Sequence, residues 1–207
     1  GCHIEVHGSG LLPDIYNSPG LESGDLETCE RQKYQEMWQY DIYRQFAPGE
    51  FHVERAIETL NMNPGDTVID FGCGTGRGAE KFRQMGFDIV GMDFAENCLD
   101  PNVKIPFVQS CLWDLPDMQA KFGYCTDVME HIPSEKVDDV LKGIADRCQA
   151  AYFNISTQDD VCGSLIGKKL HLTVKDASWW EIQLRKYWSR VVVLDSLNEA
   201  TFAVSKH

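Results

Sequence analysis

The stretch Val68-Ile69-Asp70-Phe71-Gly72-Cys73-Gly74-Thr75-Gly76-Arg77 decides the fold class of this chain. An apolar, β-branched run leads into an acidic residue, and three glycines follow at alternate positions before a helix-like segment. Glycine allows a positive φ and lets a ligand come close to the main chain, and the start of a helix offers unpaired N–H groups. The stretch therefore predicts a strand, a tight turn and a helix that bind a nucleotide-like ligand.

Strands and helices alternate around this turn. Predicted strands cover residues 67–71, 87–92, 105–109, 121–126, 150–155, 190–194 and 201–205. Predicted helices cover residues 28–46, 50–60, 75–85, 95–99, 135–147 and 176–187. Crossovers separate the first five strands, which favours a parallel sheet with helices on both faces, and the last two strands are close enough to form an antiparallel hairpin. We expect an α/β fold with a doubly wound, seven-stranded, mostly parallel sheet, an antiparallel last strand and an N-terminal helical extension.

The chain divides into two predicted parts. Residues 1–49 are expected to form an N-terminal arm and a lid helix. Within them, residues 1–27 show no sustained periodicity of apolar residues and are rich in Gly, Pro, Ser and acidic residues. Pro48-Gly49 ends the lid helix. Residues 50–207 are expected to form the ligand-binding domain.

Composition narrows the class of partner. A net charge of −13 disfavours contact with nucleic acid, which normally needs a basic face. The sequence has neither a run of about 18 apolar residues nor a recognisable secretory leader, so we expect a cytoplasmic protein without a membrane partner. The eight cysteines lack C-x-x-C spacing, which predicts free thiols in a reducing compartment and no metal site.

The residues around the turn narrow the ligand. The glycines do not follow the G-x-G-x-x-G spacing of dinucleotide-binding proteins; they are Gly72, Gly74, Gly76 and Gly78. A carboxylate at Asp70 would repel a pyrophosphate but attract an ammonium group. Asp93 follows the second predicted strand, where a carboxylate can accept hydrogen bonds from two ribose hydroxyls.

With these residues in place, the chain resembles the class I S-adenosylmethionine-dependent methyltransferases over about residues 50–205. The segment from Asp70 to Gly76 is similar to the first motif of that family, and Asp93 is similar to its acidic second-strand end. The resemblance implies S-adenosyl-L-methionine as the cofactor, with Asp70 and the glycine loop at its amino-acid part and Asp93 at its ribose. The cofactor-binding residues that it implies are Asp70, Gly72, Cys73, Gly74, Gly76, Asp93, Phe94, Cys111, Leu112, Trp113 and Asp127.

One implied contact departs from the family pattern. The loop after the third predicted strand covers the adenine in many relatives, and an acidic residue there binds the adenine amino group. Cys111 occupies that position in this chain. The main-chain N–H of Leu112 and the ring of Trp113 are the remaining candidates for the adenine contact.

The acceptor side is predicted from two histidine-containing segments and the lid helix. The segment 126–133 resembles one found near the transferring methyl group in methyltransferases that act on small molecules. His131 and His171 are candidates for a general base, because histidine exchanges protons near neutral pH; alternatively, His131 only shapes the cofactor site. The resemblance implies a small-molecule acceptor. The residues expected to contact it are Tyr34, Trp38, Tyr43 and Glu130.

Three other functions stay open from the sequence. The chain can bind S-adenosylmethionine without turnover, use it in a different reaction, or modify nucleotides or nucleic acid. The sequence argues against modification of DNA bases. The chain lacks the Asn/Asp-Pro-Pro-Tyr/Phe segment of DNA methyltransferases and has Asp127-Val128-Met129-Glu130 at that place.

Overall fold

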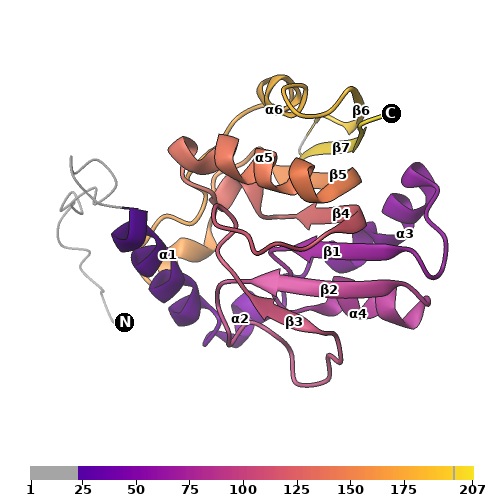
Figure 1. Cartoon of the computed structure of the whole chain (residues 1–207). Coiled ribbons are helices and arrows are strands. Elements are labelled where there is room, and N and C mark those ends of the chain that lie inside the picture. The colour runs from indigo at the N-terminus through magenta and orange to yellow at the C-terminus, as the bar shows by residue number, and fades with distance from the viewer. Residues whose placement is uncertain (1–22, 198) are drawn as a thin grey trace, which may run out of the picture.

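The computed structural model describes residues 23–197 and 199–207, and a seven-stranded sheet runs through its centre (Figure 1). The strand order is β3-β2-β1-β4-β5-β7-β6. The strands are β1 (Thr67–Phe71), β2 (Asp88–Asp93), β3 (Phe107–Gln109), β4 (Ala120–Thr126), β5 (Cys148–Ser156), β6 (Arg190–Asp195) and β7 (Glu199–Ser205). Strands β1 to β5 pair in parallel, and β7 runs antiparallel to both β5 and β6. The predicted doubly wound sheet with an antiparallel last strand is confirmed.

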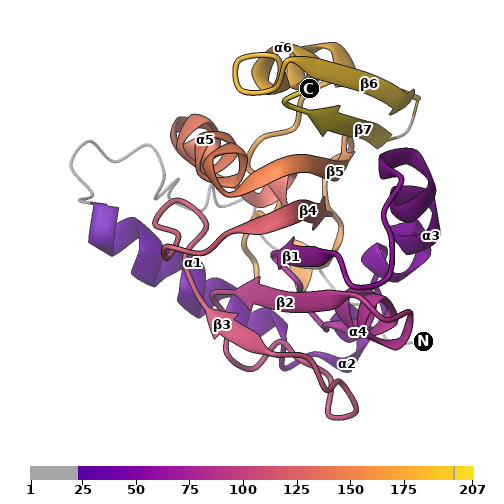
Figure 2. The same ribbon diagram turned by 45° about the vertical axis from the view of Figure 1, so that its right-hand side comes forward.

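Helices cover both faces of the sheet (Figure 2). They are α1 (Ser23–Met37), α2 (Asp41–Arg44), α3 (Gly49–Leu60), α4 (Arg77–Gln84), α5 (Val137–Arg147) and α6 (Ala177–Leu184). Side chains of a strand alternate between its two faces, and those of β1 do so here. Val68 belongs to the core that includes α3 and α4, whereas Ile69 belongs to the core that includes α5 and α6. Burial on both faces explains why β1 reads as a continuous apolar run.

The lid region differs from the prediction of one helix over residues 28–46. Helix α1 already begins at Ser23, inside the predicted arm, and a turn separates it from α2. The side chain of Arg44, the last residue of α2, fixes this turn. Its Nε donates to the carbonyl of Trp38 at 2.8 Å, and its Nη1 donates to the carbonyl of Cys98 at 2.9 Å. Residues 1–22 of the predicted arm lie outside the described residues.

Two shorter elements also differ from the prediction. Residues 95–99 form turns and not a helix, and the Arg44 side chain donates to the carbonyls of Asn97 and Cys98 that a continuing helix would use. Strand β3 begins at Phe107 and not at residue 105, because Pro106 has no N–H to donate to a strand ladder.

The topology brings three strand ends together. Strand β1 pairs with β2 on one side and with β4 on the other, and the chain crosses in opposite directions from this point of the sheet. Open α/β sheets bind ligands outside the carboxyl ends of the strands at such a switch point. Helix α1 lies beyond these ends of β1 and β2 (Figure 1). Within residues 23–197 and 199–207, no helix is long and apolar enough to span a bilayer.

Candidate active site

The glycine turn after β1 is folded back onto the end of β2. The backbone N–H groups of Gly72 and Cys73 both donate to the carbonyl of Met92 at 2.8 Å. Gly72 has φ of 76°, and a Cβ atom there would lie 2.5 Å from Cγ2 of Val128. The turn therefore requires glycine at this position for both its backbone conformation and its lack of a side chain.

A pocket opens above this turn. It is bounded by the ends of β1, β2 and β4, by the segment that follows β3, and by the N-terminal helices. The predicted site residues that line it are Tyr34, Trp38, Tyr43, Asp70, Gly72, Cys73, Gly74, Asp93, Phe94, Leu112, Trp113, Asp127 and His131. Sequence reasoning missed further lining residues, among them Phe46, Ala47, Pro48, Gly49, Thr126 and Val128.

Gly76 and Cys111 are predicted cofactor residues that lie outside this lining. Gly76 has φ of 76° and stands at the N-cap of α4, where a Cβ atom would lie 2.8 Å from Leu99 and Val103. It shapes the turn. Cys111 is buried behind the pocket wall, while Leu112 and Trp113 reach the pocket.

Asp93 is held in place by the turn that it faces. Its Oδ2 accepts a hydrogen bond from the N–H of Gly74 at 3.1 Å, and its Oδ1 accepts one from the N–H of Ala95 at 3.0 Å. Burial raises the pKa of Asp93 to about 6, although these two N–H groups act to lower it. The carboxylate retains acceptor capacity for ligand hydroxyls, since each oxygen carries two lone pairs.

Asp70 is the second buried carboxyl of the pocket. Burial raises its pKa to about 8, and the charge of Asp93 adds to that shift. Burying a carboxylate without a cationic partner is unfavourable, so this position is well suited to the ammonium group of a ligand.

The N-terminal helices close one side of the pocket with aromatic rings. The ring of Trp38 lies 4.6 Å, centroid to centroid, from that of Tyr43. A Cβ atom on Gly74 would lie 3.1 Å from the Trp38 ring, so this ring lies directly against the glycine loop. The hydroxyl of Tyr34 lies 2.6 Å from Nδ1 of His131.

The segment that leads from α2 into the first residues of α3 forms another wall of the pocket, and the sequence predicted only a helix break there. A Cβ atom on Gly49 would lie 2.7 Å from Oγ1 of Thr126 at the end of β4, and the Tyr124 hydroxyl donates to the Gly49 carbonyl. The small residue after Pro48 was the available signal, since close backbone approach favours glycine.

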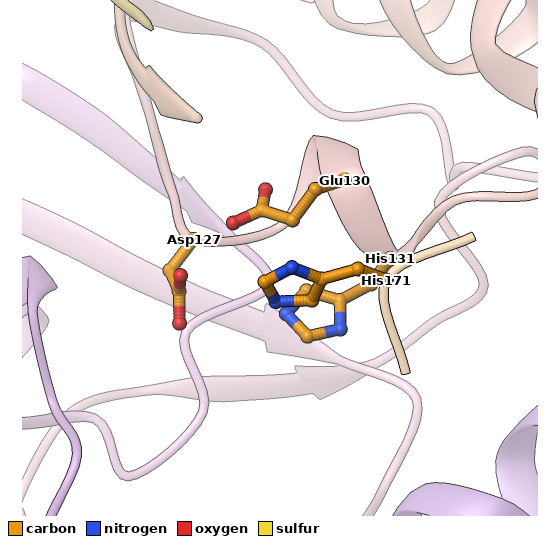
Figure 3. A group of neighbouring side chains, drawn as sticks. All are labelled: Asp127, Glu130, His131 and His171. Carbon is orange, nitrogen blue, oxygen red and sulfur yellow. The ribbon is translucent and has the colours of Figure 1, made fainter. Parts of the chain in front are cut away.

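Four predicted residues meet at the far end of the pocket, after β4 (Figure 3). Asp127, Glu130, His131 and His171 each place one ligand-type atom within 4.8 Å of the others. Asp127 and His131 line the pocket, Glu130 is fully buried, and the ring of His171 packs edge-on against that of His131 at 4.7 Å. This group of metal-type ligands was not predicted from the sequence, because His171 is far from the other three residues in the chain.

Burial dominates the ionisation of this group. It lowers the pKa of His131 to about 4, although the charge of Asp127 opposes the shift. Burial also raises the pKa of Glu130 well above its usual range, and Asp127 adds to it through its charge and a hydrogen bond. His131 is therefore a neutral imidazole near pH 7.

A known protein family matches most of this chain. The model described as "Methyltransferase domain" matches residues 30–202. The chain belongs to this methyltransferase family. The match confirms the resemblance seen in the sequence, and it covers the second half of α1, all of α2 and the sheet as far as Phe202 in β7.

The matches to curated relatives cover only part of this methyltransferase and only part of each relative. The chain is 25% identical to the ubiquinone biosynthesis O-methyltransferase of Aliivibrio fischeri strain MJ11 over an alignment of 127 positions that covers 53% of this chain and 54% of that protein. It is 26% identical over 123 residues to an uncharacterised methyltransferase of Synechocystis, covering 54% and 58%. The chain thus spans about half the length of the curated relatives that it matches.

Solved structures of methyltransferases share the fold. The Synechocystis magnesium protoporphyrin IX methyltransferase with bound S-adenosylmethionine has a TM-score of 0.57 at 16% identity, covering 94% of this chain and 88% of that one. The Burkholderia thailandensis 1,6-didemethyltoxoflavin-N1-methyltransferase has a TM-score of 0.69 at 14% identity, covering 92% of each chain. At these identities the likeness supports the fold.

Proposed function

We propose that this methyltransferase transfers the methyl group of S-adenosylmethionine to a small-molecule acceptor. The observation that carries the proposal is the pairing of Asp93 with Gly74, which presents a buried carboxylate beside the glycine loop at the sheet's switch point. A ribose in this pocket would receive two acceptor oxygens from Asp93. Asp70 would bind the ammonium group of the cofactor.

The adenine ring and the amino-acid part of S-adenosylmethionine would contact neighbouring parts of the same pocket. Phe94, Leu112 and Trp113 line the pocket on the side of β3, where their apolar surfaces suit an adenine ring. Cys73 and Gly74 would contact the amino-acid part through their backbone. The acidic side chains of Asp70, Asp93 and Asp127 suit a cofactor that carries a positive sulfonium and a positive ammonium group.

The acceptor would bind between the end of β4 and the N-terminal helices. Tyr34, Trp38 and Tyr43 line this side of the pocket, and aromatic walls with a few polar groups are typical of small-molecule sites. The comparisons favour the same class, since similar proteins are named for ubiquinone biosynthesis and for 1,6-didemethyltoxoflavin. The net charge of −13 argues against a nucleic-acid acceptor.

Alignment of donor and acceptor would supply most of the rate acceleration. The methyl carbon of a sulfonium is already electrophilic, so the protein needs to hold the acceptor atom in line with the bond from carbon to sulfur. A protonated acceptor also has to lose a proton. His131 is neutral near pH 7 but a weak base because of its lowered pKa, so the loss of that proton needs further help.

Two measurements test the proposal. Calorimetric titration of the full chain with S-adenosylhomocysteine should show saturable binding at one site per chain; no binding would refute the proposal. Incubation with S-adenosylmethionine carrying a labelled methyl group and a panel of small phenols and amines should transfer label and leave S-adenosylhomocysteine. Methylthioadenosine as the product would instead indicate aminopropyl transfer.

A further inference from the structure

The cluster of Asp127, Glu130, His131 and His171 has the chemistry of a metal centre (Figure 3). We propose that it binds one divalent first-row metal ion, of the kind represented by Mn²⁺, Co²⁺ or Zn²⁺, and that this ion holds a hydroxyl oxygen of the methyl acceptor. The second half of this inference rests on the proposed function. The first half concerns only the residues of this chain.

Glu130 supplies the first argument. It is fully buried, and its Oε1 accepts a hydrogen bond from the N–H of Ser156 at 3.0 Å. Its Oε2 is also buried and has no N–H or hydroxyl donor among the described residues, so a hydrogen bond there requires a proton shared with the neighbouring Asp127 carboxyl. A buried carboxylate oxygen without a donor is costly, so a proton or a cation is required at this oxygen. Figure 3 shows the Glu130 carboxyl turned toward Asp127.

The backbone holds Glu130 beside the segment that carries His171. The carbonyl of Glu130 accepts hydrogen bonds from the N–H groups of Leu172 at 2.7 Å and Thr173 at 2.9 Å. The same Thr173 donates through its hydroxyl to the carbonyl of Ile132 at 2.7 Å. Two segments far apart in the sequence are thereby fixed against each other, and the cluster is built before any ligand arrives.

The two histidines supply the second, independent argument. Nδ1 of His171 lies 2.6 Å from the carbonyl oxygen of Gln158. A carbonyl only accepts, so Nδ1 carries the proton and Nε2 carries the lone pair. Nδ1 of His131 lies 2.6 Å from the hydroxyl oxygen of Tyr34, and that hydroxyl donates its own proton to the Leu170 carbonyl at 3.4 Å, so Nδ1 of His131 is the donor and its Nε2 carries the lone pair. Metal-binding histidines are usually oriented in this way, by a hydrogen bond from the ring nitrogen that does not bind the metal.

The donor set indicates which ions fit. Carboxylates suit Mn²⁺ and imidazoles suit Zn²⁺, Fe²⁺ and similar ions, so a mixed set of two of each selects the first-row series. Bonds from Zn²⁺ to nitrogen and oxygen are about 2.0–2.2 Å long, which places neighbouring ligand atoms of a tetrahedral site roughly 3.4 Å apart. Ligand atoms within 4.8 Å of one another reach that spacing by small side-chain rotations.

A proton shared by Asp127 and Glu130 is the competing explanation. It would satisfy the two carboxyl groups, and a raised pKa of Glu130 is compatible with it. It gives no reason for two imidazoles whose Nδ1 atoms are both engaged outside the cluster. The metal accounts for all four side chains.

The site would take part in methyl transfer through Asp127 and His131, which belong to the pocket wall that also contains Asp70 and Gly72. An acceptor hydroxyl on the ion would lose its proton to water more readily, because a bound cation stabilises the oxyanion. The oxygen would then form a bond to the methyl carbon. The bond from that carbon to sulfur would break, and its electron pair would stay on sulfur to give S-adenosylhomocysteine.

Metal binding can be measured without an acceptor. We would treat the full chain with a chelator, remove the chelator and titrate the protein with Mn²⁺, following free Mn²⁺ by electron paramagnetic resonance, and with Co²⁺, following visible absorption. We expect one ion per chain. The isosteric variant Glu130→Gln and the variant His171→Ala should each weaken Mn²⁺ binding at least about tenfold, since even outer-shell changes have effects of that size.

Matched control variants distinguish metal binding at the cluster from metal binding by exposed side chains elsewhere. Asp159→Asn and His207→Gln remove one exposed carboxylate and one exposed histidine elsewhere, and both should bind Mn²⁺ as the wild type does. Binding of S-adenosylhomocysteine by each variant verifies its fold. Wild-type protein that binds S-adenosylhomocysteine but neither metal overturns the metal site and favours the shared proton. Equal metal affinity in Glu130→Gln, His171→Ala and the wild type also overturns it. Metal binding without S-adenosylhomocysteine binding would instead overturn the proposed function.

Discussion

The carboxylate of Asp93 accepts the N–H of Gly74 at 3.1 Å, so the acid at the end of β2 and the glycine loop after β1 form one rigid unit. We predict that Asp93→Asn lowers the affinity for S-adenosylhomocysteine at least tenfold. The amide replaces a charged acceptor, and hydrogen bonds to charged groups contribute about 1.5–3 kcal/mol each. Calorimetric titration of both proteins measures the change.

Asp88→Asn is the matched control, because Asp88 is an exposed aspartate at the opposite end of the same strand. Its affinity should equal that of the wild type. Equal losses in the two variants would mean that the effect comes from total charge and not from the contact to the ribose.

Asp70 predicts how the ligand-free protein responds to pH. Its pKa is raised from 3.8 to about 8 by burial, so the folded state holds this proton more tightly than the unfolded chain does. The associated stability is fully present below pH 4 and is lost as the pH rises through about 8. One pKa unit corresponds to about 1.4 kcal/mol, and we expect Asp70 to contribute about 3 kcal/mol to the loss between pH 5 and pH 8.

Urea unfolding at pH 5 and pH 8 tests this contribution. The isosteric variant Asp70→Asn has no titrating carboxyl at this position, so its free energy of unfolding should fall less over that interval than that of the wild type. Parallel pH dependences in the two proteins would show that Asp70 is already ionised in the ligand-free fold.

The sequence predicts those parts of the structure whose decisive contacts are local. The glycine turn and the acids at Asp70 and Asp93 follow from a strand that ends beside its parallel neighbour, and the structure places them at one pocket. The break after α1 was not predictable in this way. It depends on Arg44, which binds carbonyls of Trp38 and Cys98 from two different segments, and helical spacing carries no information about such contacts.

The same limit applies to the histidines. Each was predicted near the acceptor from its own segment, but their packing at 4.7 Å depends on how the Glu130 carbonyl holds the Leu172 and Thr173 backbone. The sequence suggested two separate bases. The structure shows one cluster with both carboxylates, and this juxtaposition exists only after folding.

Gly72 predicts a stability effect with two separable causes. Gly72→Ala adds a Cβ atom at positive φ, which costs about 1–2 kcal/mol, and places that atom 2.5 Å from Val128. Overpacking typically costs a further 1–3 kcal/mol. Gly65→Ala is the control, since Gly65 also has a positive φ but a Cβ atom there meets nothing within 4 Å.

Urea unfolding should therefore rank the wild type above Gly65→Ala and Gly65→Ala above Gly72→Ala. The double variant Gly72→Ala/Val128→Ala should lose less stability than the sum of the two single changes, because removing the valine methyl groups relieves the clash. Additive losses would show that the loop moves away from Val128 without cost.

Tyr34 links the N-terminal helix to the histidine cluster, and Tyr34→Phe isolates that link. The variant keeps the ring that lies 5.5 Å from Phe94 but removes the hydroxyl beside Nδ1 of His131. The hydroxyl also donates to the Leu170 carbonyl at 3.4 Å, so we predict a loss of about 1–2 kcal/mol in the free energy of unfolding, the size of one or two hydrogen bonds. If His131 is a metal ligand, the variant should also bind Mn²⁺ about tenfold more weakly, because its ring orientation is no longer fixed.

Tyr40→Phe provides the comparison, since it removes a hydroxyl from the same segment at a ring that is 37% exposed. It should leave both the free energy of unfolding and the Mn²⁺ affinity near the wild-type values. A Tyr34→Phe variant that loses stability but keeps full Mn²⁺ affinity would assign the hydroxyl to docking of α1 alone. Weaker Mn²⁺ binding with full binding of S-adenosylhomocysteine would instead show that Tyr34 acts on the cluster through His131, separately from the cofactor site.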